Sequence, residues 1–78
     1  MSLVLYGRPG CHLCDEARTV LERIGHQFEE VDIETDDALL VRYLERIPVV
    51  VLDGAELYDF FVDEVKLRAR LDARVRRA

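Results

Sequence analysis

The segment Leu3–Cys14 joins an apolar run, a turn and two cysteines in that order, and this order restricts the fold more than any other part of the chain. Leu3–Tyr6 are four consecutive apolar residues, which is typical of a strand covered on both faces. Gly7–Gly10 contains two glycines and a proline, which end regular structure. Cys11 follows at once, so the first thiol is expected directly after a strand and a turn.

An amphipathic helix is predicted to begin at or just after Cys11, because apolar residues recur after it at helical spacing. They are Leu13, Ala17, Val20, Leu21 and Ile24. Gly25 is suited to a C-terminal cap, so the helix is expected to end at Ile24 or Gly25. The first N–H groups of a helix lack partners and its dipole leaves partial positive charge there, which favours a thiolate on Cys11.

The two cysteines are expected to differ in exposure and therefore in role. Cys14 lies one turn after Cys11, within reach for a disulfide, and on the inward side of the helix with Ala17 and Leu21. An exposed Cys11 would then be the attacking nucleophile and a shielded Cys14 the resolving thiol. Arg8 and His12 are candidates to stabilise the Cys11 thiolate, whereas the carboxylate of Asp15 is expected to disfavour it.

The middle of the chain predicts a strand, a helix and a second strand. Phe28–Ile33 reads as a strand whose acidic residues, Glu29, Glu30 and Asp32, suit a sheet edge. Thr35, Asp36 and Asp37 supply the start of a helix that Pro48 is expected to end. Val49–Leu52 is a continuous apolar run, which is typical of a central strand.

The last third predicts a hairpin and a third helix. Asp53–Gly54 is a tight-turn signal, so a strand over Glu56–Phe60 should return antiparallel to the preceding one. Asp63 is a good N-cap for the last helix, and Val62 is placed to contact Leu67 across its first turn. The order is therefore βαβαββα, which predicts an α/β fold with a four-stranded mixed sheet and helices on both faces.

Length and composition restrict the class of protein further. The chain of 78 residues is expected to form one domain over residues 1–78. Its apolar runs are far shorter than the roughly 18–20 residues that span a bilayer, and the N-terminus lacks a secretory pattern, so we expect a cytoplasmic monomer with no membrane association. The net charge of −5 disfavours nucleic acid as a partner.

A metal site is not expected within the chain. His12 lies between the two cysteines and His26 follows Cys14 by twelve residues, without the paired histidines of a closed zinc site. Two cysteines three apart in a reducing compartment remain compatible with redox chemistry or with a metal or cluster shared between chains.

The sequence resembles the thioredoxin superfamily and, within it, the small bacterial glutaredoxin-like proteins, over essentially the whole chain. Three marks carry the resemblance. The first is the strand followed by Tyr6, Arg8 and the C-x-x-C of Cys11 and Cys14; the second is Ile47–Pro48 before an apolar strand; the third is Val62–Asp63 at the start of the last helix. The chain departs from glutaredoxins in having His-Leu between the cysteines, where Pro-Tyr is common.

The resemblance implies a thiol-disulfide oxidoreductase with no tightly bound cofactor. It implies a cis Ile47–Pro48 bond beside Cys11, with the Ile47 backbone, Pro48 and Val62 at the substrate and Asp63 facing the γ-glutamyl amine of glutathione. The implied partners are a disulfide-containing protein or glutathione, and an external reductant that is either glutathione or a thioredoxin reductase-like enzyme. The alternative from another class is a non-enzymatic iron–sulfur, metal-binding or scaffold module on the same fold.

Overall fold

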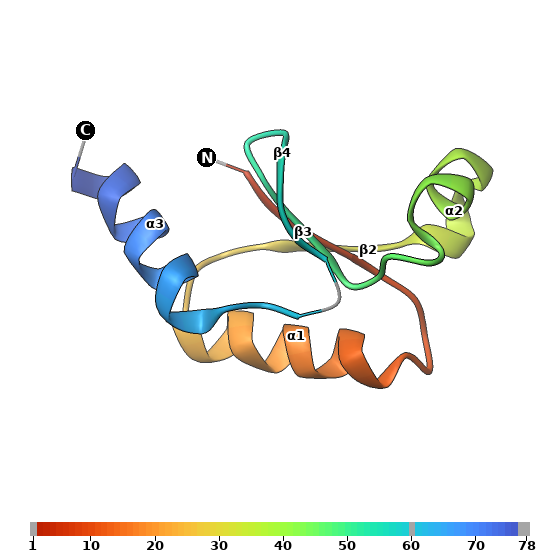
Figure 1. Cartoon of the computed structure of the whole chain (residues 1–78), viewed down its shortest axis with the longest axis horizontal. Coiled ribbons are helices and arrows are strands. Elements are labelled where there is room, and N and C mark those ends of the chain that lie inside the picture. The colour runs from red at the N-terminus through yellow and green to blue at the C-terminus, as the bar shows by residue number, and fades with distance from the viewer. Residues whose placement is uncertain (1, 60, 77–78) are drawn as a thin grey trace.

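The computed structural model describes residues 2–59 and 61–76, and Figure 1 shows their arrangement. The elements are β1 (Leu3–Gly7), α1 (His12–Ile24), β2 (Glu29–Asp32), the 3₁₀ turn η1 (Ile33–Thr35), α2 (Asp37–Tyr43), β3 (Val49–Leu52), β4 (Ala55–Asp59) and α3 (Glu64–Arg76). The predicted βαβαββα order is confirmed, with η1 added between β2 and α2. Phe60, the expected end of the fourth strand, lies outside the described residues.

The four strands form one mixed sheet in the order β2-β1-β3-β4. β1 pairs parallel with β2 and antiparallel with β3, and β3 pairs antiparallel with β4. The prediction that the acidic strand lies at an edge is therefore confirmed, and so is the central position of Val49–Leu52, all four of which are buried. A parallel pair joined through α1 and a hairpin after β3 account for this mixture.

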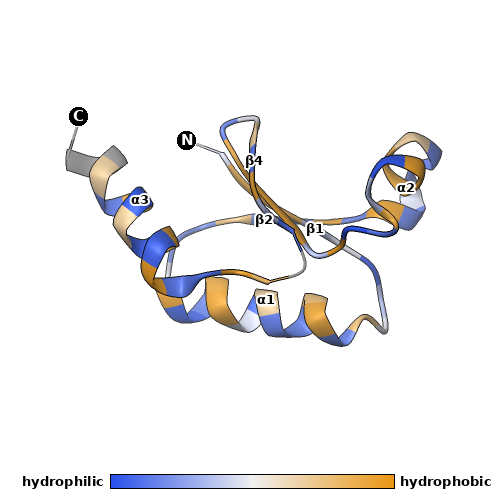
Figure 2. Cartoon of the chain, in the orientation of Figure 1, coloured by the Kyte–Doolittle hydropathy of each residue, from blue (hydrophilic) through white to orange (hydrophobic). Residues whose placement is uncertain are grey.

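Alternation along the central strands divides the core between the two faces of the sheet. Leu3 and Leu5 of β1 pack with the inward residues of α1 and α3, whereas Val4 and Tyr6 pack on the face that α2 covers. Figure 2 shows the apolar stripe of α1 facing the sheet. The predicted helices on both faces are thus confirmed, because side chains with a period of two require a cover on each side.

Two of the element boundaries that differ from the sequence expectation are the end of β2 and the end of α2. Ile33 is fully buried but begins η1 instead of ending β2, because the Asp32 carboxylate accepts the Glu34 N–H at 2.9 Å and turns the chain there. The helix expected to run as far as Pro48 ends at Tyr43. The N–H groups of Arg46 and Ile47 both bond the Tyr43 carbonyl, at 2.8 and 3.0 Å, in a closing turn. The residue directly before a proline avoids helical geometry, so Ile47 could not have continued the helix as far as Pro48.

The hairpin between β3 and β4 is the predicted tight turn. Asp53 and Gly54 have φ angles of 51° and 84°, the positive pair that a two-residue turn of this hand requires. A bulge follows in β4: Val51 pairs with Glu56 but Val50 pairs with Tyr58, so Leu57 is an extra residue. The sequence did not predict this bulge.

Candidate active site

The first cysteine is the N-cap of α1. The loop that leaves the end of β1 turns at Gly10, whose φ of 79° is one that glycine adopts without strain, and brings Cys11 to the helix start. The Cys11 sulfur accepts the backbone N–H of Cys14 at 3.2 Å. Cys11 is half-buried, so its sulfur combines access from solvent with a donor from the helix terminus.

The second cysteine is shielded. Cys14 is only 1% exposed, in the inward row of α1 with Ala17 and Leu21, as expected. Burial raises the pKa of the Cys14 thiol to about 12, and a hydrogen bond and the charge of Cys11 add to the shift, whereas the Arg8 backbone amide opposes it. Cys14 therefore stays protonated at neutral pH.

Gly7 is a site residue that the sequence analysis missed. The sequence placed Gly7 in the turn, but it is the last residue of β1 and faces α1 directly at Cys14. A Cβ at this position would lie 3.0 Å from the Cys14 sulfur and 3.2 Å from its Cβ. The Cys14 thiol therefore occupies the space that a side chain at position 7 would need. A glycine inside a strand pattern is a sign of such close approach.

The ionisable side chains near Cys11 pair with other ionisable side chains. A guanidinium nitrogen of Arg8 lies 3.4 Å from the Glu34 carboxylate, and the exposed His12 ring lies 3.3 Å from Glu16 one turn on. Asp15, expected to oppose the thiolate, pairs with Arg18 at 2.9 Å, which offsets its charge. The roles of Arg8 and His12 at the thiolate stay predictions, and the Glu34 contact competes with any approach of Arg8 to Cys11.

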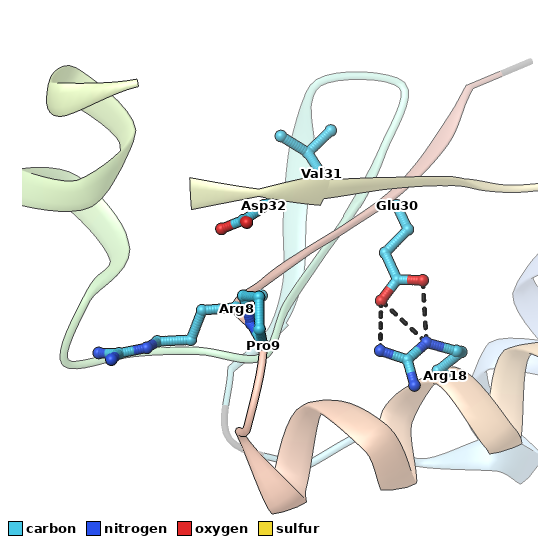
Figure 3. A pocket seen from close by; sticks show the side chains of 7 residues that line it. Arg8, Pro9, Arg18, Glu30, Val31 and Asp32 are labelled. Carbon is cyan, nitrogen blue, oxygen red and sulfur yellow. Dashed lines mark hydrogen bonds and ion pairs between the residues drawn. The ribbon is translucent and has the colours of Figure 1, made fainter. Parts of the chain in front are cut away.

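A cavity of about 350 Å³ opens beside the loop that carries Cys11. It is lined by residues of β1, the loop after it, α1 and β2: Gly7, Arg8, Pro9, Arg18, Glu30, Val31 and Asp32. Figure 3 shows that the Arg18–Glu30 pair closes one side, with a shortest contact of 2.6 Å, whereas Arg8 points away from this pair. Arg18 therefore ties α1 to the edge strand next to the cysteine loop.

The remaining predicted site residues lie on separate segments. Val62 packs against the core that contains Leu67 and shares a hollow of about 110 Å³ with Leu13 of α1. Asp63 caps α3 as predicted, because its carboxylate accepts the Lys66 N–H at 3.0 Å. The Ile47–Pro48 peptide bond is cis, with Pro48 buried. Within the described part of the chain, no three potential metal ligands come together, and no helix there is long and apolar enough to cross a membrane.

The stability of the reduced protein is expected to fall as pH rises above the ordinary thiol pKa of about 8.5. The folded state keeps the Cys14 proton up to about pH 12, whereas the unfolded chain loses it at lower pH. Between these pH values the folded state binds more protons than the unfolded state, so raising the pH lowers the free energy of unfolding. Urea unfolding at pH 8 and pH 10.5 under reducing conditions measures the effect. Cys14→Ala should show a smaller fall than the native sequence, and equal falls would contradict the assignment.

The sheet order, the helices on both faces and a C-x-x-C pair at the start of α1 define a protein of the thioredoxin superfamily. The family model described as "Glutaredoxin-like domain (DUF836)" matches residues 2–72. The chain belongs to this glutaredoxin-like family. The comparison with curated protein sequences gave no match.

Solved structures of similar proteins agree with this assignment. The X-ray structure of protein XcR50 from X. campestris is 42% identical with a TM-score of 0.78, over 92% of this chain and 97% of that one. The solution structure of Ne2328 from Nitrosomonas europaea is 33% identical with a TM-score of 0.74, over 88% of each chain. A glutaredoxin from Brucella melitensis, 23% identical over 94% of this chain and 86% of that one, with a TM-score of 0.71, shares the fold.

Proposed function

We propose that this chain is a thiol-disulfide oxidoreductase that uses a dithiol mechanism, with Cys11 as nucleophile and Cys14 as resolving thiol. The observation that carries the proposal is the contrast between the two sulfurs. Cys11 is half-buried at a helix start and accepts a backbone N–H, whereas Cys14 is buried and its pKa is raised to about 12. A general thiol-disulfide function fits the glutaredoxin-like family.

The reaction is a two-electron exchange in two steps. The Cys11 thiolate attacks one sulfur of a substrate disulfide, forms a mixed disulfide and releases the other sulfur as a thiolate that takes up a proton. The bound Cys11 sulfur then carries no negative charge, so the contributions of Cys11 that raise the Cys14 pKa disappear. Cys14 loses its proton, attacks Cys11, and releases the second substrate thiol. The chain is left oxidised and the substrate reduced by two electrons.

The proposal also names a class of substrate and a source of electrons. The substrate is a protein disulfide or a glutathione mixed disulfide, and glutathione or a thioredoxin reductase-like enzyme restores the two thiols. The Ile47 backbone and Val62 flank the substrate, with Asp63 at its amino group, as the resemblance to glutaredoxins implies. Asp63 already accepts the Lys66 N–H through one oxygen, so its other oxygen is the one that would bind. We propose action as a monomer in the cytoplasm.

Incubation with glutathione disulfide is expected to lower the mass of the reduced protein by about two daltons as Cys11 and Cys14 pair, and dithiothreitol should restore it. Intact-mass spectrometry and thiol titration measure the change, and metal analysis of the same sample tests the alternative of a metal- or cluster-binding module. Bound metal or iron in the freshly purified protein, together with thiols that resist oxidation, would favour that alternative.

A further inference from the structure

Arg46, the residue directly before Ile47, is bound to two carboxylates of β4. Its Nη2 lies 2.7 Å from Oε1 of Glu56, and its Nε lies 3.3 Å from Oδ2 of Asp59. Arg46 holds the pKa of the Glu56 carboxyl below its usual range. The segment that leads into Pro48 is therefore fixed by its side chain to a strand that follows it in the sequence.

The bulge in β4 makes this double contact available. In a regular strand, residues three apart point to opposite faces, so Glu56 and Asp59 would not share a partner. The extra residue Leu57 changes the alternation: Leu57 and Tyr58 both pack on the core beneath α1 and α3, while Glu56 and Asp59 both reach Arg46. The irregularity thus places two carboxylates on the α2 side of the sheet.

The backbone carbonyl and the buried ring of Tyr43 also hold the segment that leads into Pro48. The Tyr43 carbonyl accepts the N–H groups of both Arg46 and Ile47, and the Arg46 guanidinium lies 5.6 Å from the centroid of the Tyr43 ring. Tyr43 is 5% exposed, and its ring stacks on Tyr6 of β1 with centroids 4.8 Å apart. Arg46 therefore sits between a fixed ring and two strand carboxylates.

We propose that Arg46 is a positioning residue that fixes the Ile47–Pro48 segment against β4 for docking of the substrate polypeptide. This inference rests on the proposed function, in which the Ile47 backbone faces the substrate. Isolated surface ion pairs contribute little to stability, but displacement of a docking group by about 1 Å can cost two orders of magnitude in rate. The expected consequence is weaker docking without a change in the chemistry of Cys11.

The test compares Arg46→Gln with Arg42→Gln. Arg42 also pairs with Glu56, at 3.3 Å, and lies over the Tyr43 ring, but it is five residues before Ile47, which makes it a matched control. The reduced protein is mixed with a peptide that contains one disulfide, and the rate of oxidation of the Cys11–Cys14 pair in a single turnover is followed against peptide concentration. Iodoacetamide alkylation of Cys11 measures thiol reactivity, and hydrogen exchange measures protection of the Ile47 amide.

Arg46→Gln is expected to raise the half-saturating peptide concentration about 10-fold and to speed exchange of the Ile47 amide about 10-fold. The maximal rate and the alkylation rate should stay within about twofold, as should every measurement on Arg42→Gln. Asp59→Asn removes the charge from one of the two contacts and should shift the same two quantities about threefold, so it provides the test if Arg46→Gln fails to fold.

Unchanged half-saturation and unchanged Ile47 exchange in both Arg46→Gln and Asp59→Asn would overturn the proposal. Equal shifts in Arg42→Gln would do the same, because the effect would then belong to the whole cluster. A native protein that the peptide does not oxidise at all would contradict the proposed function instead. The exchange measurements would then decide by themselves whether Arg46 holds the segment.

Discussion

Cys11→Ser is expected to abolish disulfide reduction, with a loss of at least about 1,000-fold, whereas Cys14→Ser should accumulate mixed disulfides at Cys11. A serine hydroxyl at position 11 would accept the same Cys14 N–H but is not ionised at neutral pH, so it cannot attack a disulfide. Removal of Cys14 leaves the first step intact and blocks the second. Intact-mass spectrometry after incubation with a peptide disulfide or glutathione disulfide distinguishes the two variants.

Selective alkylation provides the control for the order of attack. At neutral pH iodoacetamide should modify Cys11 in the native protein, because the Cys14 thiol is buried and protonated, and it should modify Cys11 equally in Cys14→Ser. Faster modification of Cys14 than of Cys11 would reverse the two roles. Accumulation of mixed disulfides at Cys14 in Cys11→Ser would lead to the same conclusion.

Gly7→Ala is expected to slow closure of the Cys11–Cys14 disulfide by about 10- to 100-fold and to destabilise the reduced protein by about 1–3 kcal/mol. The new Cβ would lie 3.0 Å from the Cys14 sulfur, so the thiol or α1 must shift. The φ angle of Gly7 is not among the positive ones, so alanine meets no backbone strain there and the effect belongs to the contact. Stopped-flow oxidation and urea unfolding measure the two quantities.

The double variant Gly7→Ala/Cys14→Ala separates the contact from other effects of the substitution. Without the Cys14 sulfur the nearest clash is gone and only the Cβ contact at 3.2 Å remains. The stability cost of Gly7→Ala should therefore shrink when it is measured against Cys14→Ala. A cost that is the same in both backgrounds would show that Gly7 is needed for the strand and not for the resolving thiol.

The features that could be predicted from the sequence rest on local patterns. The run Val49–Leu52, the Asp53–Gly54 turn and the stripe of α1 each show their period or turn chemistry within a few residues. The different burial of Cys11 and Cys14 follows from the same helical period. The N-cap at Asp63 could also be predicted, because it depends on residues within one helical turn.

The features that could not be predicted depend on contacts between distant segments. The approach of Gly7 to Cys14 depends on how closely α1 packs on β1, which no local pattern encodes. Arg18 pairs with Asp15, which offsets the charge expected to oppose the Cys11 thiolate, and it also pairs with Glu30 of the edge strand, a contact that the local sequence does not show. The bulge at Leu57 depends on cross-strand register, and it decides which carboxylates meet Arg46.

The stacked tyrosines give the molecule a built-in optical reporter. The chain has three tyrosines and no tryptophan. Tyr6 and Tyr43 stack on the face covered by α2, whereas Tyr58 packs against the core of the opposite face. Intrinsic fluorescence and near-ultraviolet circular dichroism therefore arise largely from two separate environments. In a Tyr58→Phe variant the tyrosine signal comes from the Tyr6–Tyr43 pair alone, and it would show detachment of α2 from the sheet without any added label.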